Sequence, residues 1–412
     1  MTGLLLGMGA RAGQEGGSVD APPVRSARWG VGLTSAIREA FDSNVFLQDE
    51  TQAGDHASFV TTWLGQATAT WTSAPWKARL GYQPEASFFH AEPTEDFFAH
   101  RAQADLSFDR GGTRAELSGS AALIDGDSEG PTWTGPGGAP ATGGPAIRDR
   151  RDAAVYRGCL RLTQAWGPWL VRPTATGYDH DFRTAQRIAP GYQNYVDRKE
   201  FTVGADFGNR LAPPVSVGLG YRYGEQDESP LLGFPEEYDS RFHRLLGWVE
   251  GRVLPWLDVA VSAGPEMRRY GDRVPASFGD RDEANFFVDA SLTLTPGKSD
   301  KVTVSAKQFE QPGFGGRSAY EDLTFDVGWR HGLTKRWTVG IGGRAYNTDF
   351  LAPVVRNDWV LSVHGLVHCS ITQALAAEGS YQFEEGSTED PQASAREYTR
   401  HLVSLGLKYT FR

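Results

Sequence analysis

The chain has 412 residues, including 49 glycines, and carries a formal net charge of -10. This charge disfavours a nucleic-acid or anionic-lipid partner, since both bind basic surfaces. The mean hydropathy of -0.42 and the lack of any run of about 18 apolar residues exclude a transmembrane helix.

The N-terminal segment carries features of a secretory signal peptide. Gly3–Gly9 is a short apolar run, and Ala10-Arg11-Ala12 fits a small-x-small cleavage site before Gly13. A basic region before the apolar run is missing, so an ordinary disordered N-terminus stays an alternative. We expect residues 1–12 to be a signal-peptide remnant, residues 13–28 a periplasmic lead-in, and residues 29–412 the folded part.

From Trp29 onward, segment after segment alternates apolar and polar residues with period two, the pattern of a strand with one apolar face. Leu80 and Tyr82, for example, alternate with Lys77 and Arg79. A soluble β-sandwich alternates as well, but it does not place charges in mid-strand opposite large aromatics in strand after strand. A barrel with lipid outside and water inside does. The clearest segments are 76–89, 98–109, 215–224, 319–330 and 337–346.

Connections of two lengths alternate between these segments, with eight short turns and nine longer polar loops. Eighteen strands follow, an even number that puts both chain ends on the short-turn side. We predict an all-β fold, a closed antiparallel up-and-down transmembrane β-barrel of about 18 strands, with short periplasmic turns and long outer loops. A count of 16–18 is compatible with the weaker segments 169–178 and 302–309.

Tryptophans mark one rim of this barrel. Indole prefers the bilayer interface, where its ring is half buried and its N–H finds water or a headgroup. Eight of the twelve tryptophans flank the short turns or the start of the barrel, which predicts a periplasmic interface girdle; packing in a soluble core is the alternative. The girdle residues are Trp29, Trp71, Trp76, Trp166, Trp169, Trp256, Trp329 and Trp337.

The first strand and loop carry a family resemblance. Residues 37–46, which include Phe41, Asp42, Asn44 and Phe46, form an aromatic-Asp-x-Asn-hydrophobic-Phe stretch before an acidic loop. This stretch resembles the opening of the β-barrel porin type 2 family. The resemblance implies an outer-membrane location in a Gram-negative bacterium and a pore or exopolysaccharide-export setting. By their chemistry alone, Asp42 and Asn44 suit a turn after a strand rather than a ligand site.

The C-terminal segment is the most regular strand of the chain. Val403, Leu405 and Leu407 alternate with Ser404 and Gly406, and the segment 402–412 matches the ~9–11 residues of a tilted strand across a bilayer. It resembles the last strand of bacterial outer-membrane barrels, which implies the barrel-assembly machinery as a partner. It departs from that pattern because Arg412 follows the final Phe.

Charged residues fill the faces predicted to point inward. Both signs occur, basic ones mainly in the first half of the chain and acidic ones in the second, so the two halves could create a transverse field across a water-filled lumen. Cross-strand salt bridges that merely cover the wall are an equal alternative. The predicted pore-lining residues are Lys77, Arg79, Arg101, Asp105, Arg114, Glu116, Arg157, Arg161, Arg222, Asp322, Asp326, Arg344 and Lys408.

The longest connection, residues 126–151, is the candidate constriction loop. It is rich in Gly and Pro and carries charges at both ends that could narrow a lumen, although a mobile surface loop is the plainer interpretation. The candidate residues are Asp125, Asp127, Glu129, Arg148, Arg150 and Arg151.

Catalytic and metal-binding patterns are missing. His364 and His368 lie four apart on a predicted strand, about 13 Å, too far to chelate one metal ion. Cys159 and Cys369 fall on opposite faces of distant strands, which disfavours a disulfide. We expect no metal, no cofactor and no enzymatic activity.

Two functions stay open on this reading. The first is a water-filled pore, porin-like or an export conduit, for polar solutes or glycans. The second is a structural or surface-interaction barrel with an occluded lumen. Few aromatics point inward (Phe89, Phe287, Tyr320 and Tyr346), which disfavours a selective sugar path. The acidic outer loops could share divalent cations with lipopolysaccharide, the expected lipid partner. The oligomeric state is not predicted.

Overall fold

The computed structural model describes residues 28–49, 56–129, 147–189, 192, 194–212, 214–314, 316–389 and 397–411. The expected signal-peptide remnant and nearly all of the lead-in lie outside these residues, as does most of the loop 126–151. Within the described ranges, no helix is long and apolar enough to cross a membrane.

The described residues fold into strands joined by turns and loops, with two 3-10 turns, η1 (Pro93–Glu95) and η3 (Ala276–Phe278). The strands are β1 (Arg28–Asp42), β2 (Ser58–Ser73), β3 (Trp76–Phe89), β4 (Phe97–Arg110), β5 (Thr113–Asp125), β6 (Ala153–Trp166), β7 (Trp169–Phe182), β8 (Arg198–Ala212), β9 (Val215–Glu228), β10 (Ser240–Leu254), β11 (Leu257–Tyr270), β12 (Asp282–Leu294), β13 (Asp300–Pro312), β14 (Ala319–Gly332), β15 (Trp337–Phe350), β16 (Arg356–Ser370), β17 (Leu375–Thr388) and β18 (Tyr398–Phe411).

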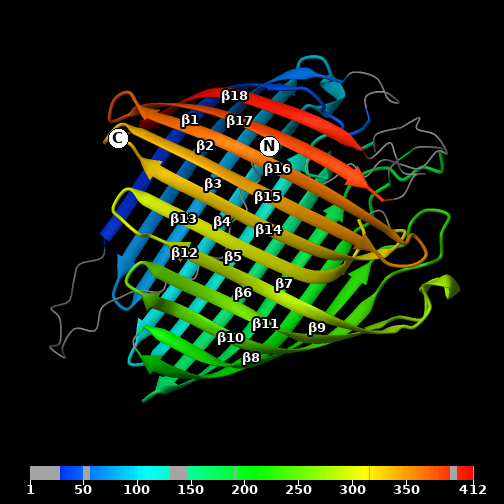
Figure 1. Ribbon diagram of the computed structural model, residues 1–412, viewed down its shortest axis with the longest axis horizontal. Helices are drawn as coiled ribbons and strands as arrows, with labels where there is room; N and C mark the ends of the chain where they lie inside the picture. The colour runs from blue at the N-terminus through cyan, green and yellow to red at the C-terminus, as the bar shows by residue number, and fades with distance from the viewer. Residues whose placement is uncertain are drawn as a thin grey trace.

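The strands form one closed sheet. Each pairs antiparallel with its sequence neighbours, and β18 returns to pair with β1 from Leu33↔Phe411 to Asp42↔Leu402. Closure removes the free edges at which strands of other chains could add. Figure 1 shows the tilted strands, with short turns at one end of the barrel and long connections at the other. The predicted fold class, a closed up-and-down barrel of 18 strands, is confirmed.

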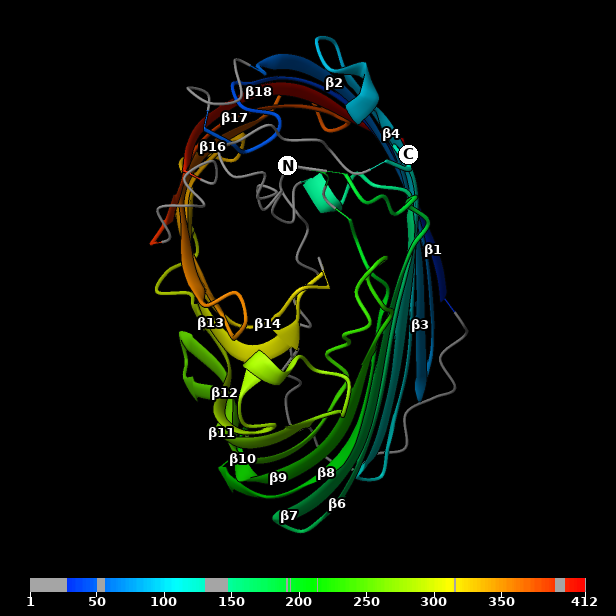
Figure 2. The same cartoon turned by 90° about the vertical axis from the view of Figure 1, so that its right-hand side faces the viewer.

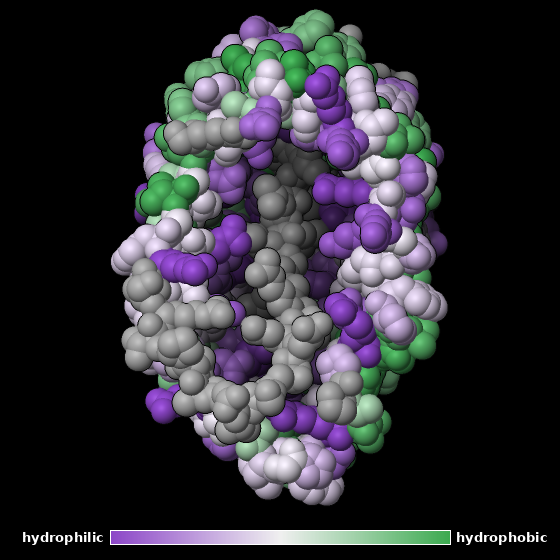
Figure 3. Space-filling view, turned by 90° about the vertical axis from the view of Figure 1, so that its left-hand side faces the viewer, coloured by the Kyte–Doolittle hydropathy of each residue, from purple (hydrophilic) through white to green (hydrophobic). Residues whose placement is uncertain are grey.

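The two faces of the wall differ in polarity as the alternation predicts. Leu80, Leu219 and Leu405 point outward and are 59%, 72% and 71% exposed, whereas their polar sequence neighbours point inward. Large apolar side chains with this exposure require hydrocarbon around them. Figure 3, seen from the short-turn side, shows a hollow bordered by hydrophilic residues and hydrophobic residues on the outer flank.

Aromatic residues lie at both rims of the outer face. The eight predicted girdle tryptophans lie beside the short turns, and some pack in pairs, as Trp29 does with Trp71 at 6.3 Å between ring centroids. Nearer the long loops, three outward tyrosines each share a hydrogen bond with the Nδ1 atom of a histidine on the next strand, at 2.6–2.9 Å. These pairs are Tyr82–His100, Tyr221–His243 and Tyr381–His401. The tryptophan girdle as a membrane interface stays a prediction.

A buried ion pair joins the first and last strands. Arg400 on β18 donates from Nε and Nη2 to the two carboxylate oxygens of Asp42 on β1, at 2.8 and 2.5 Å. Asn44 supports the same turn, because its backbone N–H donates to Asp42 Oδ1 and its side chain donates to Gln48 O. Asp42 and Asn44 therefore have the turn role expected from their chemistry, and Asp42 also fixes the closure of the barrel.

Figure 2 shows an oval cross-section with β7–β10 at one end of it, and side chains of these strands pack together there. The Trp248 ring lies over β8 and β9, where a Cβ on Gly208 or Gly218 would come within 2.5 Å of it. Arg172 lies 5.0 Å from the centre of this ring and forms an ion pair with Glu250. These packed side chains narrow the lumen beside β7–β10.

Candidate functional site

The hairpin between β13 and β14 leaves the wall and enters the lumen. Pairing of β12 with β13 runs only from Leu294↔Val302 to Val288↔Gln308, although β12 begins at Asp282 and β13 continues to Pro312. We call residues 309–314 and 316–321 the infolded hairpin. Figure 2, seen from the long-loop side, shows this yellow segment inside the outline of the barrel.

Glu310 anchors the base of the infolded hairpin. Its backbone carbonyl accepts a hydrogen bond from Arg268 Nη2 at 3.0 Å, and its carboxylate accepts from Tyr270 and Asn285. Arg268 and Tyr270 face the lumen from β11, and Glu310 is fully buried against them. The β13 side of the hairpin therefore leaves β12 and lies against the inner face of β11, whereas its β14 side stays paired with β15 up to Tyr320↔Phe350.

The tip of the infolded hairpin reaches the opposite wall. Arg198 on β8 donates to Gln311 Oε1 at 2.6 Å and to the Pro312 carbonyl at 3.3 Å. The Val196 N–H donates to Phe314 O at 2.9 Å, and the Tyr238 hydroxyl donates to Arg317 O at 2.7 Å. These bonds come from the β7–β8 and β9–β10 sides, so the hairpin crosses the lumen and forms a constriction.

Guanidinium groups and aromatic rings meet at this constriction. Arg148 and Arg198 lie 4.0 and 4.6 Å from the centre of the Phe314 ring, and Arg157 and Arg198 lie about 5 Å from that of Tyr178. We call these five residues the basic–aromatic cluster. Among the described residues, Arg157 and Arg198 form no ion pair, and Arg148 pairs only with the adjacent Asp149. The cluster is therefore cationic.

Arg148 stays charged in spite of its burial. Burial disfavours the guanidinium ion, but the negative charge of the adjacent Asp149 favours it, and the pKa of Arg148 lies above its ordinary value. A fixed positive charge at a narrow point attracts anions and repels cations.

The other predicted constriction-loop residues are located around a buried carboxylate. Arg150 donates to Glu95 Oε2 at 2.7 Å, and Arg151 also pairs with Glu95; all three side chains are buried. Arg151 further donates to the Glu129 carbonyl at 3.3 Å and lies 3.8 Å from Asp127. Asp125, by contrast, has the outward register of β5, opposite Phe98. Residues 130–146 lie outside the described residues, so constriction by this loop stays a prediction.

The Glu95 anchor gives a pH-dependent prediction. Burial raises the pKa of Glu95, but Arg150 and Arg151 outweigh it, so the net pKa lies below the ordinary 4.5. A carboxylate with a lowered pKa contributes stability above pH 4.5 and loses it as the pH falls through the folded value. We expect hydrogen exchange at residues 147–152, corrected for its intrinsic pH dependence, to accelerate only below pH 4.5, as Glu95 becomes protonated.

A matched variant tests the same anchor at neutral pH. Glu95→Gln removes the charge and should give fast exchange at residues 147–152 already at pH 7. Exchange in the variant at pH 7 that is as slow as in the unaltered protein would contradict the role of Glu95.

The strand register places all predicted pore-lining residues on the inward face of the wall. Some are neutralised by neighbours, in the pairs Arg101–Glu85, Arg114–Glu116 and Arg344–Asp326. Two lie in packed clusters rather than on open wall, since Arg222 pairs with Asp206 and Asp322 is buried beside Gln311. Among the described residues, Lys77, Arg79, Arg157, Arg161 and Lys408 form no ion pair.

More aromatics face the lumen than the sequence analysis assigned. The register adds Tyr178 and Phe182 on β7, which stand on the same face as Arg172, and Phe242 and Trp248 on β10. Period-two counting from the outward Trp169 would have identified Tyr178 and Phe182. The expectation of few inward aromatics is wrong for these strands.

Metal and thiol chemistry have no assembled site in the part of the chain that the structure describes. No group of three or more His, Cys, Asp or Glu side chains there is arranged to hold a metal ion. Cys159 pairs across strands with the inward Ser118, and Cys369 pairs with the outward Trp337. Both thiols are free and face opposite sides of the wall.

No family model matches the chain, and no curated protein matches it in sequence. The resemblance to the β-barrel porin type 2 family therefore stays a prediction. Among solved structures, the chain is similar to OpdO of Pseudomonas aeruginosa, with 10% identity and a TM-score of 0.43 over 92% of this chain and 97% of that chain. It is also similar to OccK2 (OpdF) of the same organism, with 9% identity and a TM-score of 0.46 over 93% and 97%. A BenF-like porin from Pseudomonas fluorescens Pf-5 has 8% identity and a TM-score of 0.44 over 92% and 99%.

At these identities and scores, the similarities carry no argument about function. The assignment rests on the molecule itself, through the closed antiparallel pairing, the even number of strands and the apolar outer surface. These features make the chain a transmembrane β-barrel of the Gram-negative outer membrane.

Proposed function

We propose that this barrel is a narrow water-filled pore that passes small polar solutes across the outer membrane and prefers anions. The observation that carries the proposal is a set of inward cationic side chains that form no ion pair among the described residues, although Asp105 and Glu116 stand across from Arg79 and Arg161. Lys77 and Arg79 on β3 and Arg157 and Arg161 on β6 face the part of the lumen that the packed end leaves free. Charges on the wall of an aqueous passage raise the local concentration of oppositely charged solutes.

The infolded hairpin sets the size of the solute. It crosses the lumen and bonds to β8 through Arg198, so a solute must pass beside the basic–aromatic cluster. A small carboxylate- or phosphate-bearing molecule fits this description, because guanidinium groups bind such oxyanions with good geometry. A glycan polymer would require the hairpin to move, which makes an export conduit the less supported form of the proposal.

The membrane partners follow from the same surfaces. The C-terminal strand would be recognised by the barrel-assembly machinery, and the acidic outer loops would share divalent cations with lipopolysaccharide phosphates. These loops include Glu92, Asp272 and Asp280, which lie on the long-loop side of the barrel.

The proposal is tested in planar bilayers by the reversal potential under a potassium chloride gradient. We expect conducting channels with an anion preference, and Arg157→Gln/Arg161→Gln should lower the anion-to-cation permeability ratio roughly threefold. The control is Arg344→Gln/Asp326→Asn, which removes both members of a neutral pair joined at 2.6 Å and therefore should change the ratio little. A cation preference of the unaltered channel would contradict the proposal.

A barrel with an occluded lumen is the second candidate. The observation that favours it is the set of hydrogen bonds from β8 and the β7–β8 and β9–β10 loops to the hairpin tip. A closed trace at all voltages, with an intact fold, would select this candidate over the pore.

A further inference from the structure

Two adjoining short turns, β12–β13 and β14–β15, border an open hollow of about 610 Å³ at the periplasmic rim. Its lining contains four cationic side chains, those of Lys298, Lys301, Arg330 and Lys335. Hydroxyl groups stand among them; the lining includes Thr295, Ser299, Thr334 and Thr338. So many positive charges in one hollow contrast with the net charge of -10 of the chain.

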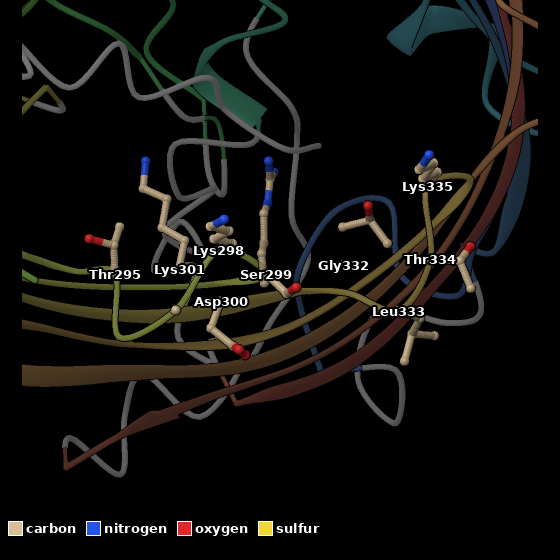
Figure 4. Close-up of a pocket in the computed structure, with 12 residues that line it drawn as sticks. Thr295, Lys298, Ser299, Asp300, Lys301, Gly332, Leu333, Thr334 and Lys335 are labelled. Atoms are coloured by element: carbon tan, nitrogen blue, oxygen red, sulfur yellow. The ribbon is translucent and has the colours of Figure 1, made fainter.

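The cations point toward the lumen side of the rim. Lys301 on β13 and Arg330 on β14 are direct cross-strand partners, and the next pair, Val302↔Trp329, faces outward, so Lys301 and Arg330 face inward. In Figure 4 the side chains of Lys301 and Lys335 extend to one side of the ribbon, away from Leu333. Like charges directly opposite on one face of a sheet destabilise it. The fold therefore tolerates a repulsion here that a bound anion would relieve.

No carboxylate of the lining neutralises these charges. Asp300 is the single acidic residue of the lining, and it points away from Lys301 and Lys335 in Figure 4. Its Oδ1 atom accepts a hydrogen bond from Trp329 Nε1 at 3.0 Å and lies 2.8 Å from His331 Nδ1. Among the described residues, none of the four cations forms an ion pair.

We propose that Lys298, Lys301, Arg330 and Lys335 form a binding site for a soluble oxyanion with two or more negative charges, such as a phosphate or diphosphate group. Lysine binds phosphate as a point charge and arginine adds directional N–H donors, while hydroxyl groups complete the oxygen shell. The site is open to water, so its affinity is low, which suits the mouth of a passage that a solute must leave again. The inference that a solute binds here as it leaves the pore at the periplasmic end rests on the proposed function, whereas the binding itself does not.

The test uses the full chain refolded in zwitterionic detergent micelles and titrated with pyrophosphate at low ionic strength by calorimetry. We expect saturable binding, weakened about tenfold in Lys298→Gln/Lys335→Gln, since each variant side chain removes one exposed charge contact. Both lysines are exposed turn residues whose side chains form no hydrogen bond with the described residues, so the fold should tolerate the change. The control is Lys199→Gln/Arg269→Gln, which removes the same charge from exposed positions on β8 and β11 and should bind as the unaltered protein does.

Two results would overturn the site: no saturable binding by the unaltered protein, or equal binding by the Lys298→Gln/Lys335→Gln variant. Because binding in micelles needs no conduction, a protein that binds pyrophosphate but stays closed in bilayers would refute the pore and keep the site. A channel that conducts in bilayers but does not bind pyrophosphate would refute the site and keep the pore.

Discussion

Removal of the hairpin tip should raise the single-channel conductance roughly threefold, because the current through a narrow aqueous path scales with its cross-section. The variant replaces residues 313–318 by a two-residue Asn-Gly turn, which suits the direct pairing of Pro312 with Ala319. It deletes Phe314, against which Arg148 and Arg198 pack, and the bond from Val196 N to Phe314 O. Planar-bilayer recordings measure the change.

A point variant and a matched control separate widening from loss of stability. Phe314→Ala should give a smaller increase in conductance. Phe98→Ala removes a phenylalanine from the lipid-facing register of β4, where Phe98 is paired with Ala86, and should leave the conductance unchanged. If the tip deletion conducts as the unaltered protein does, the infolded hairpin is not the constriction.

Breaking the pair between β1 and β18 should cost about 3–5 kcal/mol in Asp42→Ala, because Arg400 would remain buried without its carboxylate. Both oxygens of Asp42 are used by Arg400, and both side chains are buried. This pair stands at the single place where the two ends of the chain meet in the sheet. Its loss should therefore lower the stability of the whole barrel rather than of one loop.

Denaturant unfolding in micelles, followed by the gel shift between folded and unfolded barrel, measures this loss. The control is Asp326→Ala, which breaks the cross-strand pair with Arg344; that pair is half exposed, so about 0–1 kcal/mol is expected. Equal effects of the two variants would show that the Asp42–Arg400 pair has no special part in closure.

The fold could be predicted because one physical rule governs nearly every strand. Lipid outside and water inside impose a period of two, and this period alone placed Leu80 and Leu405 outward and Lys77 and Arg157 inward. The alternation of short and long connections then gave the strand number. The resemblance of the first strand and loop to one porin family is a separate matter and was not needed for the fold.

The infolded hairpin could not be predicted from alternation, although the sequence contained a signal for it. Gln308 and Glu310 continue the lipid-facing register of Val304 and Ala306, and Glu310 stands directly opposite Glu321. Two carboxylates facing hydrocarbon are too costly, so this part of the hairpin must leave the wall. Polar residues at lipid-facing positions therefore predict that the strand leaves the wall there, but they do not predict whether it turns into the lumen or away from the barrel.

The basic–aromatic cluster was only partly predicted, for a related reason. Arg148 was a constriction candidate because its loop is long and charged, and Arg157 was expected on the inward face. Arg198 and Phe314 come together only through the path of the hairpin across the lumen, a tertiary contact between residues 116 positions apart in the chain. No local pattern marks such a contact.

The placement of the two cysteines on opposite sides of one wall gives the molecule a pair of native reporters. Cys159 belongs to the watery interior and Cys369 to the hydrocarbon exterior near the inner rim. A hydrophilic thiol reagent should therefore react with Cys159 from the water in the lumen, and a lipophilic one with Cys369 from the bilayer. The labelling rates of the two native thiols then report water access to the lumen and contact with the bilayer separately, without any engineered cysteine.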